Sequence, residues 1–215
     1  MAARERILAE IRKRQGRGGP LSALERETLD TYLKRHPRGP LREPAADVVA
    51  AFRERAEAAA CTTDRVASHS KVPDAVARYL DAGNLPGSGC VWPDLAQLDW
   101  KSAKLLLEPR AACDDDAIGV TGVFCAIAET GTLMLCSGAD TPASVSLLPE
   151  THIAIVPVER IVQVMEDAWD LARAELGQLP RAVNFISGPS RTADIEQTIV
   201  LGAHGPFRVH LVLVG

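Results

Sequence analysis

From residue 61 onward, short apolar segments alternate with helical patterns, and this alternation restricts the possible folds more than any other feature of the chain. Helical spacing of apolar residues predicts helices at 73–82 and 159–176, each followed by a glycine. The apolar segments predict strands at residues 65–68, 90–92, 103–107, 126–128, 133–135, 153–156, 183–186 and 209–214. Continuous apolar strands between helices are typical of a mostly parallel sheet that helices cover on both faces. We therefore expect an α/β domain over residues 45–215.

The first 44 residues differ from the rest in charge. They hold 11 Lys and Arg against 6 Asp and Glu, so they carry a net charge of +5 while the remainder carries −9. Their apolar spacing predicts two short helices, the second starting at a capping box of Ser22 and Glu25, and a further helix is predicted from Asp47. We expect residues 1–44 to form a basic helical N-terminal extension that packs against the main domain. Its charge suits an acidic partner or a plain solvated face, whereas the lack of accompanying aromatic residues argues against nucleic acid.

Composition and cysteine usage exclude several classes of protein. No apolar run approaches the roughly 20 residues of a membrane-spanning helix, and the charged N-terminus does not match a signal peptide. The five cysteines never form a Cys-x-x-Cys pair, which favours a cytoplasmic location and argues against a self-contained iron–sulfur or structural zinc site. The consecutive acids at 114–116 are expected to begin a solvated helix rather than to bind a metal. We therefore expect no metal and no cofactor.

Polar residues with special backbone requirements gather in four clusters, at 119–122, 128–132, 187–194 and 202–206. In an open α/β sheet, ligands bind in the crevice beyond the carboxyl ends of the strands. The third cluster is predicted to open a helix at 193–196, where backbone N–H groups together with Ser190, Arg191 and Thr192 suit a carboxylate or a phosphate. Helix capping by Ser190 or Thr192 explains the same residues equally well.

Six strings in the second half of the chain resemble one known family. They are Gly-Val-Thr-Gly at 119–122, Ala-Ile-Ala-Glu-Thr-Gly-Thr-Leu at 126–133, Ser-Leu-Leu-Pro at 146–149, Asn-Phe-Ile-Ser-Gly-Pro-Ser at 184–190, Ala-Asp-Ile-Glu at 193–196 and Gly-Ala-His-Gly-Pro at 202–206. Together and in this order they resemble the LUD-domain family, most closely its lactate utilisation protein C branch. The resemblance is dense from 119 to 206 and thinner from about 47 to 117.

The resemblance implies a fold, a pathway and partners. The implied fold is a three-layer α/β arrangement with a mostly parallel sheet, of the sugar-phosphate isomerase and coenzyme A transferase type. The implied function is that of a component without an iron–sulfur cluster in a system that oxidises L-lactate to pyruvate, binding a small carboxylate or phosphate, or a partner. Iron–sulfur proteins of that system are the implied partners. Because the resemblance assigns no reaction to this chain, a stand-alone transferase or ligase that uses Glu129 remains the alternative.

Glu129 and His204 are the candidate catalytic residues. Glu129 ends an apolar strand, where an ionised carboxylate is costly unless it is paired or faces a cleft, and the resemblance suggests a comparison with the attacking glutamate of coenzyme A transferases. His204 suits a general base or a donor that faces a ligand. A role in stabilising turns explains either residue as well. The candidate ligand-binding residues come from the same clusters and are Thr121, Gly122, Thr130, Gly131, Ser187, Gly188, Ser190, Arg191, Thr192, Asp194 and Gly205.

Overall fold

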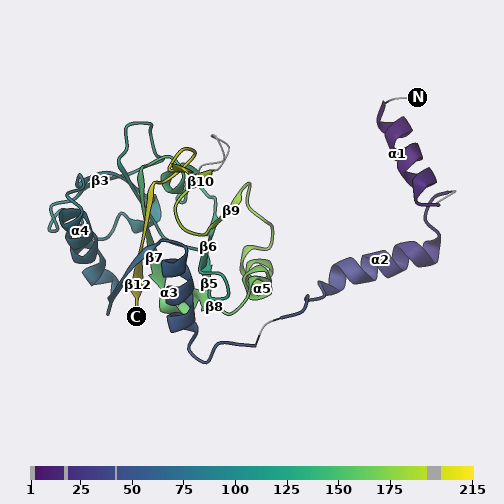
Figure 1. Ribbon diagram of the computed structural model, residues 1–215, viewed down its shortest axis with the longest axis horizontal. Coiled ribbons are helices and arrows are strands. Elements are labelled where there is room, and N and C mark those ends of the chain that lie inside the picture. The colour runs from purple at the N-terminus through teal and green to yellow at the C-terminus, as the bar shows by residue number, and fades with distance from the viewer. Residues whose placement is uncertain (1–2, 17–18, 42, 193–199) are drawn as a thin grey trace. The chain divides into compact units, whose positions relative to one another are not determined.

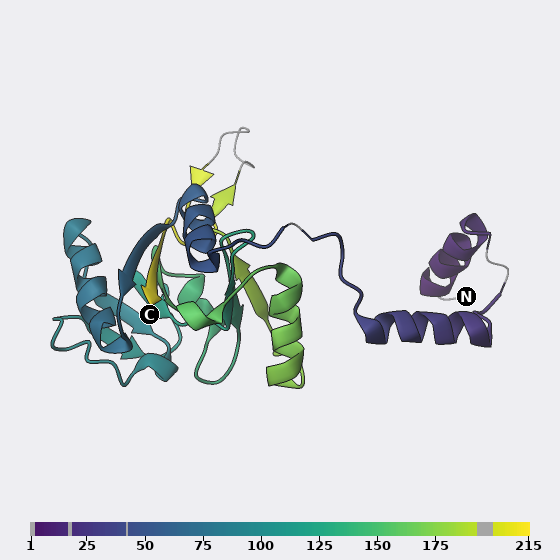
Figure 2. The ribbon, with the colours of Figure 1, turned by 90° about the horizontal axis from the view of Figure 1, so that it is seen from below.

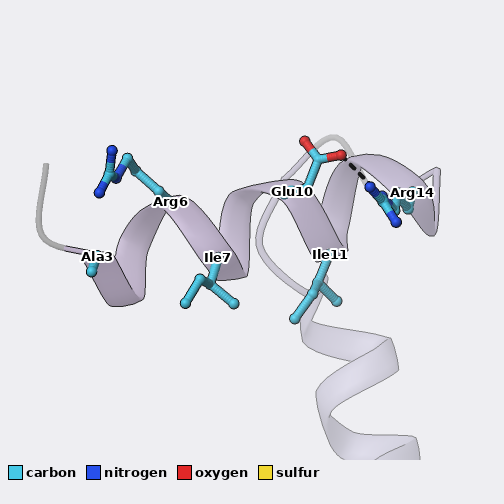
Figure 3. A pocket seen from close by; sticks show the side chains of 6 residues that line it. All are labelled: Ala3, Arg6, Ile7, Glu10, Ile11 and Arg14. Atoms are coloured by element: carbon cyan, nitrogen blue, oxygen red, sulfur yellow. Dashed lines mark hydrogen bonds and ion pairs between the residues drawn. The ribbon is translucent and has the colours of Figure 1, made fainter.

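The computed structural model describes residues 3–16, 19–41, 43–192 and 200–215, and the chain divides into two compact units, Met1–Arg42 and Glu43–Gly215. The smaller unit contains helices α1 (Ala3–Arg14) and α2 (Ala23–Arg35). The predicted capping box is confirmed, because Glu25 N–H donates to Ser22 Oγ at 3.2 Å and Ser22 N–H donates to the Glu25 carboxylate at 2.8 Å. Figure 3 shows Ile7 and Ile11 on one face of α1, away from the Glu10–Arg14 ion pair of 3.0 Å. No described residue of either helix is buried.

The main sheet of the larger unit is parallel throughout and has the strand order β1-β12-β7-β4-β2-β3. In that order the strands are Thr62–Val66, Arg208–Val214, Thr151–Pro157, Ile118–Thr121, Ser88–Val91 and Leu106–Pro109. The three central strands, β12, β7 and β4, consist almost entirely of buried residues. Burial on both faces is what their continuous apolar runs predict.

Helices cover the two faces of this sheet. On one face lies α4 (Val72–Ala82), where the Tyr79 ring stacks on His210 of β12 with ring centroids 3.8 Å apart. On the other lies α3 (Val48–Ala58), since Arg53 Nε donates to Thr63 Oγ1 at 2.9 Å and Thr63 points away from the face that carries His210. The short 3-10 helices are η1 (His69–Lys71), η2 (Pro93–Leu95), η3 (Ala143–Ser146) and η4 (Val158–Arg160).

A second sheet lies between the main core and helix α5 (Met165–Leu176). Its strands, in spatial order, are β8 (Ile161–Val162), β5 (Cys125–Ile127), β6 (Thr132–Cys136) and β9 (Val183–Ile186). Leu133 and Leu135 face the main core, while Met134 between them packs with Ala168 of α5. Figure 2 shows α4 and α5 on opposite sides of the two sheets. The predicted α/β class, with a mostly parallel central sheet, is confirmed.

Three local predictions were wrong. Residues 119–122, expected as a loop, begin inside the buried strand β4. The helix expected from 159 starts only at Met165, because Ile161 and Val162 pair with β5 instead. The strand expected at 103–107 is β3, at Leu106–Pro109, and it is a largely exposed edge strand. In addition, β10 (Arg191–Thr192) and β11 (Val200–Leu201) form an antiparallel pair, and the helix expected at 193–196 lies outside the described residues. No helix in the described parts of the chain could span a membrane.

Candidate functional site

Three of the four predicted loop clusters meet at one edge of the main sheet, the amino edge, where β1, β7 and β12 begin. They are the β5–β6 hairpin at 129–132, the segment 187–192 after β9, and the segment 202–206 before β12. Figure 1 shows β10 at this end of the sheet, opposite the end at which β12 reaches the C-terminus. The prediction placed these loops beyond the carboxyl ends of strands. Two of them do follow strands of the second sheet, β5 and β9, but relative to the main sheet all three lie at the amino edge.

The C-terminal end of α3 holds the first two loops through backbone contacts. Gly131 has φ +65°, and a Cβ placed there would lie 2.4 Å from the backbone nitrogen of Ala56. Gly188 has φ +80°, and its Cβ would lie 2.1 Å from the carbonyl oxygen of Ala59. Only glycine tolerates both this backbone conformation and this close approach. Both glycines, predicted to bind a ligand, are therefore explained by chain packing.

A chain of hydroxyl groups joins the same two loops. Thr130 Oγ1 donates to Thr132 Oγ1 at 2.7 Å, and Thr132 Oγ1 lies 2.6 Å from Ser187 Oγ. Thr132 is buried, whereas Thr130 and Ser187 are exposed. The chain of hydroxyls thus satisfies the buried Thr132 and presents polar groups to solvent at both ends.

Arg191 stabilises the end of α3. Its Nη2 donates to the carbonyl oxygen of Ala59 at 3.1 Å, close to the negative end of the helix dipole. Beside it, burial raises the pKa of the Cys61 thiol to about 11, although Gly188 N–H and Arg191 oppose this. Cys61 is therefore a protonated, buried thiol at neutral pH and is not available as a nucleophile.

Ser190 connects the third cluster to the fourth. Its N–H donates to the carbonyl oxygen of Pro206 at 2.9 Å, and its own carbonyl accepts from Gly202 N–H at 2.9 Å. A Cβ on Gly205 would lie 3.2 Å from Cβ of Ser190 and 3.6 Å from the carbonyl oxygen of Leu147. Because Leu147 belongs to the Ser-Leu-Leu-Pro segment at 146–149, this segment also reaches the amino edge. His204 is exposed in the loop that contains Gly205.

Four exposed apolar side chains lie at the amino edge, and residue-by-residue prediction missed them. This amino-edge patch consists of Leu147 (41% exposed), Leu148 (53%), Leu201 (39%) and Phe207 (42%). Phe207 N–H donates to the carbonyl oxygen of Glu150 at 2.8 Å, which ties the two halves of the patch together. The sequence did hold one sign of this patch: Leu147 and Leu148 stand beside a proline, in a segment without the apolar periodicity of a buried strand or helix.

Glu129 is half-buried at the start of the β5–β6 hairpin. Its N–H donates to the carbonyl oxygen of Gln163 at 2.9 Å. The Gln163 side chain in turn binds the backbone of Ala45 twice, accepting from its N–H at 3.1 Å and donating to its carbonyl at 2.9 Å. The hairpin is thus fixed to the segment that leads into α3, which gives Glu129 a defined position.

The remaining predicted site residues lie elsewhere. Thr121 is fully buried in β4, where its Oγ1 lies 2.8 Å from Nε2 of His152, and Gly122 follows it at the carboxyl edge of the sheet. Burial lowers the pKa of His152 to about 4, so this imidazole is neutral. Thr192 is half-buried in β10, and Asp194 lies outside the described residues.

The acidic run at 114–116 does not begin a helix. Asp116 instead accepts two hydrogen bonds from the Arg110 guanidinium, at 2.6 and 2.9 Å, and the pairing lowers the pKa of its carboxyl. Within the described residues, no group of three His, Cys, Asp or Glu side chains is arranged to hold a metal ion.

Comparison with known proteins identifies relatives of this chain. The family model of the LUD domain matches residues 93–214. The chain is 44% identical over 100 residues to lactate utilization protein C of Bacillus subtilis. The aligned region covers 45% of this chain and 42% of that protein. It is 46% identical over 120 residues to lactate utilization protein C of Halalkalibacterium halodurans, covering 54% of this chain and 50% of that protein. The match therefore spans about half the length of these curated relatives.

The fold also resembles a solved structure. A DUF162 family protein from Deinococcus radiodurans superposes with a TM-score of 0.60 at 26% sequence identity. The superposition covers 82% of this chain and 100% of the other.

Proposed function

Because this chain belongs to the LUD-domain family, we propose that it is a component of a lactate utilisation system that oxidises L-lactate to pyruvate. The names of its relatives support the pathway. Cys125 and Cys136 share the second sheet, whereas Cys61 lies at the amino edge and Cys90 in β2, so the cysteines are spread over several parts of the domain. In this proposal the chain is the component without an iron–sulfur cluster, and iron–sulfur proteins are its partners.

We further propose that the chain acts by docking a partner protein at the amino edge. The observation that carries this proposal is the amino-edge patch, in which four large apolar side chains are exposed. Exposed apolar residues grouped in this way favour a protein interface. Small-anion binding at the same edge is less favoured, because Arg191 already serves the negative end of α3 and the hydroxyl groups bond to one another.

Growth on L-lactate tests this proposal. In a strain that lacks the chain, Leu148→Asp should fail to restore growth and should not co-purify with the iron–sulfur proteins, because a charge would be buried in the interface. Leu106→Asp is the matched control, since Leu106 is 72% exposed at the start of edge strand β3, three strands away from β7 in the sheet. Normal growth of the deletion strain, or of a Leu147→Asp, Leu148→Asp double variant, would refute the proposal.

The alternative is a stand-alone acyl transferase that uses Glu129 as its nucleophile. The bond from Glu129 N–H to Gln163, which holds this residue in place, favours this alternative. In that reaction the Glu129 carboxylate attacks the carbonyl carbon of an acyl-coenzyme A thioester, and the coenzyme A thiolate leaves as the mixed anhydride forms. Hydroxylamine would convert the anhydride to a hydroxamate on Glu129, which mass spectrometry detects. A hydroxamate that is absent from Glu129→Gln would establish the alternative, and its absence from the wild type across a broad panel of acyl donors would exclude it.

A further inference from the structure

A separate cavity of about 330 Å³ opens at the carboxyl edge of the main sheet, the end opposite the amino-edge patch. Trp92 and Gly122, which follow the neighbouring strands β2 and β4, both line it. The chain leaves these two strands in different directions, toward edge strand β3 after β2 and toward the second sheet after β4. Such a divergence beyond the carboxyl ends of parallel strands is where open α/β sheets bind ligands. The volume is at the lower end of the range for small-molecule sites.

The walls of this cavity are joined by hydrogen bonds. Trp92 Nε1 donates to the carbonyl oxygen of Pro142 at 3.0 Å, which fixes the indole ring. Thr141 Oγ1 donates to the carbonyl oxygen of Cys136 at 2.9 Å. Ser137 and Ala182 bond twice, since Ser137 N–H donates to the Ala182 carbonyl at 3.0 Å and Ala182 N–H donates to Ser137 Oγ at 2.9 Å. The cavity is therefore preformed, which reduces the entropic cost of binding.

Gly122 lies against the Trp92 ring, and both residues line this cavity. Its φ is outside the left-handed region, so the backbone does not require glycine here. A Cβ at this position would lie 3.6 and 3.7 Å from two atoms of the Trp92 ring, which is ordinary contact without a clash. A side chain would thus be sterically tolerated but would occupy the cavity. Unlike Gly131 and Gly188, Gly122 has its most direct explanation in the space that it leaves free.

The charges around the cavity determine the kind of ligand that fits. Asp94 lines it, and no lysine or arginine does so among the described residues. The nearest guanidinium that the contacts identify, Arg160, lies over the Phe124 ring at 5.0 Å, and both of its terminal nitrogens bond to Glu175 at 2.8 and 2.9 Å. Among the residues that line the cavity, an anion would therefore meet the Asp94 carboxylate and no lysine or arginine, whereas a cation would meet Asp94 and the aromatic rings of Trp92 and Phe124.

From this arrangement we propose that the cavity between the ends of β2 and β4 is a binding site for a small organic cation, an amine or amidine attached to an apolar ring. The ring packs between Trp92 and Phe124, and the cationic group faces Asp94. This site is independent of the proposed docking function, because it lies at the other edge of the sheet and involves none of the same residues.

Three probes of nearly equal shape test the proposal with the full-length chain: benzamidine, benzamide and benzoate. Tryptophan fluorescence and ligand-observed NMR at low salt should show that benzamidine binds more tightly than benzamide and that benzoate does not bind. Asp94→Asn should remove the preference for benzamidine, an effect of about fivefold at most for an exposed carboxylate. Asp81→Asn, on the exposed surface of α4, is the matched control and should change nothing.

Gly122→Val fills the cavity and should abolish the binding of benzamidine and benzamide alike. If this variant does not fold, the wild-type backbone amide of Gly122 and the indole N–H of Trp92 should both shift in protein NMR spectra on addition of benzamidine. The proposal is overturned if benzoate binds as tightly as benzamidine, if folded Gly122→Val retains binding, if neither NMR signal shifts, or if none of the three probes binds at millimolar concentration.

Discussion

Two buried histidines should lower the free energy of unfolding in mild acid. His152 on β7 and His210 on β12 are both buried, and burial lowers the pKa of each from an ordinary 6.5 to about 4. Each ring has one nitrogen near a threonine hydroxyl at 2.8 Å, while Nδ1 of His152 and Nε2 of His210 are buried without a hydrogen-bond partner among the described residues. Asp64 opposes the lowering at His210 but does not cancel it.

The sign and size of the effect follow from proton binding. Between pH 6.5 and 4 the unfolded chain binds more protons than the folded chain, because the folded pKa values are the lower ones. The contribution to stability is therefore fully present above pH 6.5 and is lost as the pH falls toward 4. A shift of this size costs about 2 kcal/mol per histidine at pH 5, or about 4 kcal/mol for the pair.

Urea unfolding at pH 8, 6 and 5 measures this effect. The free energy of unfolding of the wild type should fall between pH 8 and pH 5 by about 4 kcal/mol more than that of a His152→Gln, His210→Gln double variant. Comparing the two proteins cancels the contribution of carboxyl groups that titrate in both. His69→Gln removes an exposed histidine and should keep the full wild-type dependence. Equal pH dependence in the wild type and the double variant would show that the buried rings do not titrate as argued.

Further variants test the packing and the chemistry of the fold. Gly131→Ala forces a methyl group against the backbone of α3 and should destabilise by about 3 kcal/mol or more in urea unfolding. Gly177→Ala has a similar φ of +64° with open space around it, so it should cost less, about 1–3 kcal/mol from backbone strain alone. Asp116→Ala removes the nearly buried carboxylate that accepts from Arg110, and it should lower the free energy of unfolding by about 1–3 kcal/mol. Asp114→Ala, in the same acidic run, should change it by no more than about 0.5 kcal/mol. Maleimide labelling of the native protein should modify Cys113 first, since it is exposed while three other cysteines are buried with raised pKa values; rapid labelling that persists in Cys113→Ser would contradict this.

The periodic parts of this fold were predictable from the sequence. The buried strands β7 and β12 and helix α4 lie close to their predicted positions, because apolar spacing reports directly on burial. Strand β4 was not predicted, since the string Gly-Val-Thr-Gly at 119–122 is typical of a turn. The structure shows why Gly119 is needed in the strand: a Cβ there would lie 2.0 Å from the carbonyl oxygen of Val145. That close contact comes from η3, a segment 26 residues away in the chain. Local sequence carries no signal of such a distant approach.

The sequence by itself determined the α/β class, the basic character of the first 44 residues and the family, each of which depends on periodicity, charge or ordered strings of residues. Only the tertiary structure decided what the polar loops do. It separated Gly122, at the carboxyl edge, from three loops at the amino edge. Strands β5 and β9 lead the chain back to that edge before loops 129–132 and 187–192, and loop 202–206 precedes β12. The tertiary structure also gave Gly131 and Gly188 a packing role against α3 and left Gly122 beside an open cavity. Glycines look alike in a sequence, and their roles differ because different neighbours approach each of them in space.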